Sequence, residues 1–204
     1  CPDRDLRPCE DGYAETADGW LLGIKRYRPE VPDPGKLPVV LCHGLQLNGT
    51  FWTITDHHLP SQLSERGYEV FVVDMRGSGA SHRKGTVGRV NQALRQTFLP
   101  EVGARRWTMD DQAFYDVPAI LHYVERSTGA PRVNWVGHSL GGMLMYPFLE
   151  LSPESGQVAT FVAMGATAHL HTAPHHGLLR ANHALSNLVR GLSTSRMARP
   201  MRFG

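Results

Sequence analysis

The sequence predicts an α/β domain built on a mainly parallel sheet, and three observations support this fold class. Short continuous apolar runs, typical of strands buried on both faces, occupy residues 38–44, 68–75 and 132–138. Apolar residues recur at helical spacing in the segments between runs. Glycine-rich turns follow the runs, as in βαβ units. At 204 residues, the chain is long enough for one domain with a sizeable core.

The amino-terminal elements are predicted to be antiparallel. Two hairpin-like segments, "GYAETADGW" and "LLGIKRYRP", come first, and Asp18-Gly19 is the turn signal between strands. The proline-rich segment "EVPDPGKLP" closes this hairpin. The first buried strand of the parallel part, "PVVLCHG" at residues 38–44, begins directly after it.

A helix is expected next, over residues 55–66, and Gly67 ends it. The second buried strand, at residues 68–75, leads into the glycine-rich turn Arg76-Gly77-Ser78-Gly79. Residues 80–106 show no strong periodicity and are expected to form a long excursion. Loops of that length in compact domains are usually functional or mobile.

A second helix is predicted to begin near Thr108, which forms a capping box with Asp111 and precedes a run of apolar residues at helical spacing. Gly129 ends this helix, and Pro118 is expected to kink it. The apolar residues of the run are Phe114, Val117, Ile120, Leu121 and Val124. The chain continues as the strand at 132–138, a helix from residue 141 or 142 to 151, and the strand at 157–165.

The composition is that of an ordinary globular protein, and a formal charge of +2 gives no reason to expect a nucleic-acid partner. No apolar run approaches the roughly 18 residues needed to span a bilayer. Three cysteines without regular spacing argue against a disulfide framework or a zinc ribbon. Cys42 is expected to be buried in a strand, so Cys1 and Cys9 are the two cysteines that could form a disulfide. The chain starts at Cys rather than Met, so the compartment stays open.

Ser139 is the candidate nucleophile because it lies at a sharp corner between a buried strand and a helix, in "GHSLG". Gly137 and Gly141 leave room for the strained backbone that exposes such a serine. The Leu140 N–H, which opens the helix, is a candidate oxyanion donor. The second candidate donor is the N–H of Leu45, in the loop that leaves the strand ending in His43-Gly44.

Four motifs occur in the order and spacing of the α/β-hydrolase superfamily: "PVVLCHGLQLNGTFW", "YEVFVVDMRGSGAS", "WTMDDQAFYDVPAILHYVERSTG" and "VNWVGHSLGG". The chain resembles most closely the acid lipase and esterase branch. This resemblance implies a three-layer fold, ester cleavage through an acyl-enzyme on Ser139, and no cofactor. It also supports Leu45 and Leu140 as donors. We expect the substrate to be a small, apolar ester and to contact His43, Gly44, His138 and Met143.

The triad acid and histidine are not identified in this sequence. Beyond Ser139 the only carboxylates are Glu150 and Glu154, at the far end of a helix about 15 Å long. We therefore expect residues 1–166 to form the amino-terminal part of a hydrolase core, apparently incomplete at its carboxyl end. Residues 167–204 would begin a lid or a helical segment. Without the missing groups, we expect the 204-residue chain alone to have negligible esterase activity.

Two alternatives remain open. The same elbow could serve acyl transfer or thioester hydrolysis, and a protein without the acid and histidine could instead be a hydrolase-like binding protein. The coding sequence beyond Gly204 would decide the second alternative. The "DMRGSGAS" turn also resembles that of epoxide hydrolases and haloalkane dehalogenases, but those relatives use an aspartate where this chain has Ser139.

Three further patterns favour structural interpretations. A histidine group in the last quarter of the chain lacks the carboxylates or cysteines of a metal site. A leucine-rich amphipathic stretch there could be a lid that touches lipid, but an ordinary covering helix is favoured. Three aspartates near the second helix suit a helix amino terminus better than acid-base chemistry. These residues are His169, His171, His175, His176 and His183; Leu178, Leu185, Leu188 and Leu192; and Asp110, Asp111 and Asp116.

Overall fold

The computed structural model describes residues 9–54, 58–85 and 107–168. Nearly all of these belong to one compact unit, formed by residues 1–83 and 107–168. A second unit, residues 84–106 and 169–204, lies almost entirely outside the described residues. The boundary expected between residues 166 and 167 therefore stays a prediction, as do the roles considered for the carboxyl-terminal histidines and leucines.

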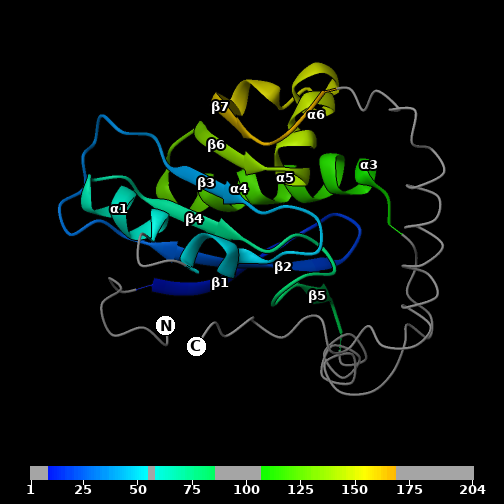
Figure 1. Ribbon diagram of the computed structural model, residues 1–204, viewed down its shortest axis with the longest axis horizontal. Coiled ribbons are helices and arrows are strands. Elements are labelled where there is room, and N and C mark those ends of the chain that lie inside the picture. Colours follow the sequence, from blue (N-terminus) through cyan, green and yellow to red (C-terminus); the bar gives the residue numbers. More distant parts are fainter. Residues whose placement is uncertain (1–8, 55–57, 86–106, 169–204) are drawn as a thin grey trace. The chain divides into compact units, whose positions relative to one another are not determined.

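A mixed sheet forms the centre of the described unit (Figure 1), with the strand order β1-β2-β4-β3-β6-β7 and β5 paired to β2. The pairs β3–β4, β3–β6 and β6–β7 are parallel, whereas β1, β4 and β5 each run antiparallel to β2. The strands are β1 Cys9–Glu15, β2 Trp20–Tyr27, β3 Val39–Cys42, β4 Val70–Val73, β5 His82–Arg83, β6 Val133–His138 and β7 Val158–Met164. The α/β fold class predicted from the sequence is confirmed.

The two sides of β3 and β4 face different apolar clusters, which explains why every residue of both strands is buried. Val39 and Leu41 pack with the first helix, whereas Val40 and Cys42 pack with the later helices. Cys42 is buried and free, as the sequence predicted. Both faces of the central strands are therefore covered, and three layers result.

Two short helices cover one face of the sheet: η1 Gly49–Thr53 and α1 Leu59–Glu65. The other face packs against helices that come later in the chain (Figure 1). These are α3 Met109–Asp111, η2 Gln112–Asp116, α4 Val117–Thr128, α5 Leu140–Met143 and α6 Met145–Leu151. A further 3-10 turn, η3 Ser155–Gln157, precedes β7. Among the described residues, no helix is both long enough and apolar enough to cross a membrane.

The second helix confirms the predicted capping box and adds an irregularity. Thr108 accepts from the Asp111 N–H while the Asp111 carboxylate accepts from the Thr108 N–H. A π-helical turn, η2, where an extra residue enters the helix, directly precedes α4, so Pro118 lies in the first turn of α4. The kink expected at Pro118 stays a prediction. Gly129 ends the helix with a φ of 74°, as predicted.

Three other elements differ from the sequence prediction. The described part of the helix expected over residues 55–66 is α1, which begins at Leu59; residues 55–57 lie outside the described part of the chain. The helix after Ser139 is divided into α5 and α6 at Leu144. The two-residue strand β5 was not predicted, because a strand this short leaves no periodicity to detect.

Candidate active site

Ser139 lies between the end of β6 and the start of α5, with φ 48° and ψ −116°. A non-glycine residue in this region is strained, and the surrounding structure must hold it there. The Ser139 N–H donates to the carbonyl of Met164, at the end of β7, over 2.8 Å. The Ser139 carbonyl accepts from the N–H groups of Gly142 and Met143 at 3.0 and 2.9 Å. Backbone bonds on both sides thus secure the strained turn.

Close packing beneath the turn explains its glycines. A Cβ on Gly137 would collide with the backbone of Gly141 and Gly142, so a side chain cannot be accommodated there. The indole N–H of Trp135, a buried residue of β6, donates to the Gly141 carbonyl over 3.0 Å. The corner is therefore rigid as well as sharp.

The loop after β3 lies directly against Ser139. A Cβ built on Gly44 would lie 3.0 Å from the Ser139 Cβ and 2.9 Å from the His138 Nδ1, so the backbones approach closely. Gly44 to Leu47 form a turn in which the Leu47 N–H donates to the Gly44 carbonyl over 3.2 Å. Gln46 has a φ of 61°, unusual for a residue with a side chain. We call residues 44–47 the oxyanion loop.

Two backbone donors beside Ser139 have no acceptor among the described residues. The N–H of Leu140 opens α5, where a first-turn amide has no partner within the helix. The N–H of Leu45 likewise donates to no group in the described part of the chain, and its side chain is 69% exposed. The two donors predicted from the sequence therefore lie on the two segments that meet at Ser139.

His43 is buried, only 4% exposed, and both of its ring nitrogens are bonded within the chain. Nδ1 lies 2.8 Å from the Gly44 carbonyl. Nε2 accepts from the Met75 N–H at 3.2 Å and lies 2.9 Å from the Ser78 Oγ. Burial lowers the pKa of His43, although the Gly44 bond and Asp74 act in the opposite direction. The substrate contact expected for this residue stays a prediction.

His138 and Met143, the other expected substrate contacts, are half-buried beside the serine. The His138 ring stacks on Phe51 of η1, with centroids 4.4 Å apart. Its Nδ1 is buried and has no hydrogen-bond partner among the described residues. The ring thus connects the corner at Ser139 to the helix that follows the oxyanion loop.

A buried charged cluster, Arg76 with Asp116 and Asp18, lies next to the turn that holds His43. Asp116 is fully buried; it accepts from the Arg76 Nε at 2.8 Å and from the Arg76 N–H at 3.1 Å. Asp18, in the β1–β2 turn, accepts from both terminal guanidinium nitrogens at 2.8 and 3.0 Å. Arg76 also lies over the Trp20 ring, 5.7 Å from its centroid.

The two carboxylates of the charged cluster differ in their pKa. Burial raises the pKa of Asp116 to about 6, although its bonds to Arg76 act in the opposite direction. Burial also tends to raise the pKa of Asp18, but hydrogen bonds from Thr16 and Arg76 outweigh it and leave that pKa lowered. Asp116 lies at the amino-terminal end of α4, as the sequence interpretation expected, but its side chain pairs with Arg76 and makes no capping bond, whereas Asp111 caps α3.

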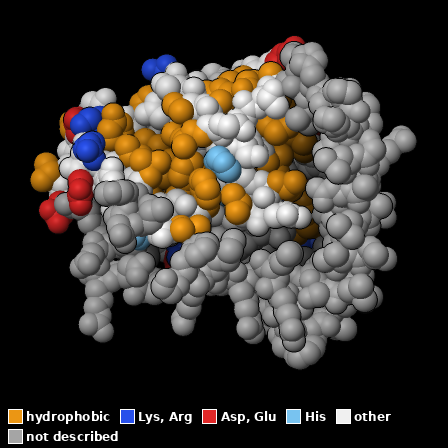
Figure 2. Space-filling model, viewed as in Figure 1, with side chains coloured by type: hydrophobic (Ala, Val, Ile, Leu, Met, Phe, Trp, Pro, Cys, Tyr) orange, Lys and Arg blue, Asp and Glu red, His pale blue; other side chains and the backbone are white. Residues whose placement is uncertain are grey.

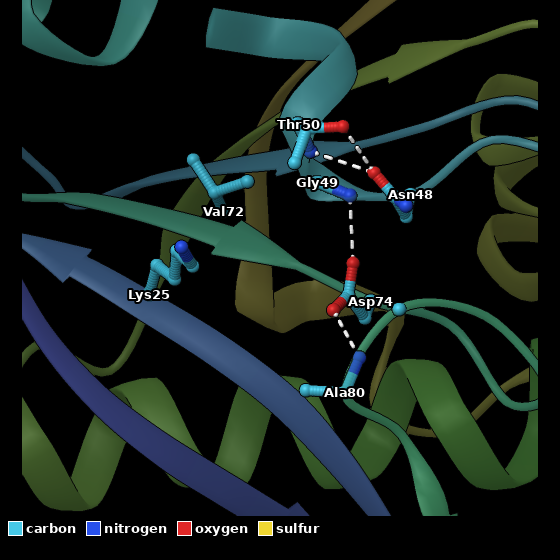
Figure 3. A pocket seen from close by; sticks show the side chains of 8 residues that line it. Lys25, Asn48, Gly49, Thr50, Val72, Asp74 and Ala80 are labelled. Carbon is cyan, nitrogen blue, oxygen red and sulfur yellow. Dashed lines mark hydrogen bonds between the residues drawn. The ribbon is translucent and has the colours of Figure 1, made fainter. Parts of the chain in front are cut away.

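Asp74 anchors the start of η1, which follows the oxyanion loop. Its two carboxylate oxygens accept from the N–H groups of Gly49 and Ala80 at 2.6 and 2.8 Å (Figure 3). The contacts thereby join the start of η1 to the turn after β4. A cavity of about 200 Å³ lies here, lined by Lys25, Asn48, Gly49, Thr50, Val72, Asp74, Gly79 and Ala80.

The two described carboxylates that follow Ser139 in the chain are not bonded to it. Glu150 is exposed on α6, and Glu154 pairs with His122 over 3.3 Å. Within residues 9–54, 58–85 and 107–168, no group of three histidine, cysteine or acidic side chains could hold a metal ion. The serine hydroxyl and two backbone donors are thus the reactive features that the described residues bring together.

Comparisons with known proteins identify the family of the chain. A family model described as alpha/beta hydrolase fold matches residues 38–192. The gastric triacylglycerol lipase of Rattus norvegicus is 27% identical over 170 residues, covering 79% of this chain and 40% of the lipase. The lysosomal acid lipase/cholesteryl ester hydrolase of Homo sapiens is 30% identical over 168 residues, with the same two coverages. The chain thus spans about 40% of the length of these relatives.

Solved structures support the fold alone, because their sequence identities are low. An esterase from Exiguobacterium antarcticum has a TM-score of 0.53 and 21% identity, covering 78% of this chain and 46% of the esterase. The esterase RhEst1 from Rhodococcus sp. ECU1013 has a TM-score of 0.54 and 22% identity, with coverages of 80% and 47%.

Proposed function

This chain belongs to the α/β-hydrolase fold family, near its lipases, and on that premise we propose that it cleaves carboxylic esters through an acyl-enzyme on Ser139. One observation carries the proposal. Ser139 is held in a strained turn, and the segments that meet beside it carry two backbone donors, Leu45 and Leu140, without an acceptor in the described part of the chain. A structural turn serine would have no need of either feature.

The reaction follows from these positions. The Ser139 oxygen attacks the ester carbonyl carbon, its proton passes to a base, and the N–H groups of Leu45 and Leu140 stabilise the oxyanion. The carbon–oxygen bond to the alcohol then breaks, and the alcohol leaves with that proton. Water attacks the acyl-enzyme in the same way and releases the acid. The base and its acid partner are assigned to residues outside those described.

An apolar acyl group is the substrate class that the surface favours. Leu45 is exposed beside the serine, and Met143 and Phe51 are half-buried nearby. Figure 2 shows hydrophobic side chains gathered over β3, β6 and β7, the strands whose carboxyl ends meet at Ser139. Burying an acyl chain here would stabilise the complex by about 0.8 kcal/mol for each methylene. The names of the lipase relatives are consistent with this class.

The test is covalent labelling with a fluorophosphonate, which forms a phosphorus–oxygen bond to an activated serine and releases fluoride. The protein should be expressed from its complete reading frame, labelled, and mapped by intact mass and peptide mass spectrometry. We expect one label, on Ser139, and none in the Ser139→Ala variant. A wild-type protein that folds but takes no label at Ser139 would contradict the proposal and favour a binding protein.

A further inference from the structure

We propose that His43 is a positioning residue: its ring holds the carbonyl of Gly44 and thereby aims the N–H of Leu45 at the oxyanion formed on Ser139. This inference rests on the proposed function. The His43 ring is buried and bonded within the chain, so the contribution proposed here passes through the backbone of the oxyanion loop.

The bonding partners of His43 determine its tautomer. The Met75 N–H can only donate, so Nε2, 3.2 Å away, must carry a lone pair. The Gly44 carbonyl can only accept, so Nδ1, 2.8 Å away, must carry the proton. The ring is therefore neutral and protonated at Nδ1. It cannot act as the base for Ser139, because Nε2 is already an acceptor within the core.

Peptide planarity links this bond to the oxyanion donor. The carbonyl of Gly44 and the N–H of Leu45 belong to the same peptide group, and in a trans peptide they point in opposite directions. Because the His43 ring draws the carbonyl inward, the Leu45 N–H must point away from the ring. The Leu47 N–H also donates to the same carbonyl, so two donors fix one peptide plane.

The close approach of the loop makes this orientation important. Gly44 lies against the Ser139 Cβ, so the next peptide group is within reach of an oxyanion formed there. Gln46, at φ 61°, completes a turn whose peptide groups could otherwise rotate toward a less strained conformation. A rotated Gly44–Leu45 peptide would present a carbonyl oxygen, rather than an N–H, to the negative charge.

Two substitutions separate the two bonds of the ring. In His43→Asn, the amide NH₂ can replace Nδ1 and still donate to the Gly44 carbonyl. In His43→Gln, the amide oxygen can replace Nε2 and still accept from Met75, but the Gly44 bond is lost. The matched control is His122→Gln, at a half-exposed histidine on α4 that pairs with Glu154.

The readout is the rate of fluorophosphonate labelling of Ser139 at increasing probe concentration. For His43→Gln we expect the saturating rate to fall about 100-fold, the loss typical of one oxyanion donor, while the half-saturating concentration stays within about threefold. His43→Asn should stay within about tenfold of wild type, and His122→Gln should match wild type. Equal losses in both His43 variants, or no loss in His43→Gln, would overturn the proposal.

A second measurement keeps this inference separate from the proposed function. Nitrogen-15 NMR of the wild-type protein should show His43 protonated at Nδ1 and not at Nε2. The Leu45 amide resonance should move in His43→Gln and stay in place in His122→Gln. If wild-type protein takes no label, the proposed function fails while the NMR result still decides the role of His43. An Nε2-protonated ring, or a Leu45 amide unmoved in His43→Gln, would overturn that role.

Discussion

Two buried polar clusters meet at the turn after β4 and differ in kind. The charged cluster (Arg76, Asp116 and Asp18) joins this turn to η2 and to the β1–β2 hairpin. The neutral cluster (His43, Ser78 and the backbone of Met75) joins it to the oxyanion loop. Ions thus secure the turn at Arg76, whereas uncharged groups secure it at Met75 and Ser78. A full charge beside the Leu45 N–H would alter the field that an oxyanion meets, and a neutral ring avoids this.

The largest effect should follow from breaking the charged cluster. Asp116→Ala leaves the Arg76 guanidinium buried with only Asp18 as a partner, and we expect unfolding free energy to fall by about 3–5 kcal/mol. Urea denaturation measures this loss. Asp110→Ala, an exposed acid of α3, is the control and should change stability little. A loss below about 1 kcal/mol for Asp116→Ala would contradict the ionic role of the cluster.

The two carboxylates of the charged cluster should give opposite pH dependences. Because the pKa of Asp116 is raised to about 6, its contribution to stability is full below pH 3.8 and is lost as pH rises through 6. Between pH 4 and pH 7, the free energy of unfolding of the wild-type protein should therefore fall by about 2–3 kcal/mol relative to that of Asp116→Asn. Asp18, with a lowered pKa, contributes stability above pH 3.8 that is lost as pH falls. Urea denaturation of wild type, Asp116→Asn and Asp18→Asn at several pH values gives the pH dependence that each carboxylate contributes to the unfolding free energy. Two contributions of the same sign would contradict this assignment.

A steric change in the oxyanion loop should affect reactivity more than stability. Gly44→Ala places a methyl group 3.0 Å from the Ser139 Cβ, so we expect fluorophosphonate labelling to fall at least about 100-fold. The stability cost should be only about 1–3 kcal/mol, because the exposed loop can shift. Gly156→Ala, with nothing within 4 Å of the new methyl, is the matched control. Full labelling of Gly44→Ala would show that the loop does not approach the reacting serine.

The smallest change in stability should come from Asp18, the most exposed member of the charged cluster. Asp18→Ala removes a carboxylate whose side chain is 27% exposed, while Asp116 still pairs with Arg76. Since solvent screens such a pair, we expect a loss of about 1 kcal/mol or less in urea denaturation. A loss larger than that of Asp116→Ala would reverse the order of importance proposed for the two carboxylates.

The sequence predicted features that depend on neighbouring residues better than features that depend on strand pairing. The turn at Ser139 was predicted because Gly137 and Gly141 lie two residues on either side of it. The bonds of His43 were not predicted, because they require Met75, which the parallel pairing of β3 and β4 brings alongside. The ion pair of Asp116 was not predicted for the same reason. Its partner Arg76 is remote in sequence, and the π-helical turn interrupts the regular helical spacing.

The bond from the Ser139 N–H to the Met164 carbonyl has a consequence for biosynthesis. The ribosome makes Ser139 well before Met164, so the nascent corner lacks this partner until β7 has emerged and paired with β6. Until then only the Ser139 carbonyl, bonded to Gly142 and Met143, is held in place. The serine can thus acquire its strained geometry only once β7 is in place, after the strands that precede it have had time to assemble.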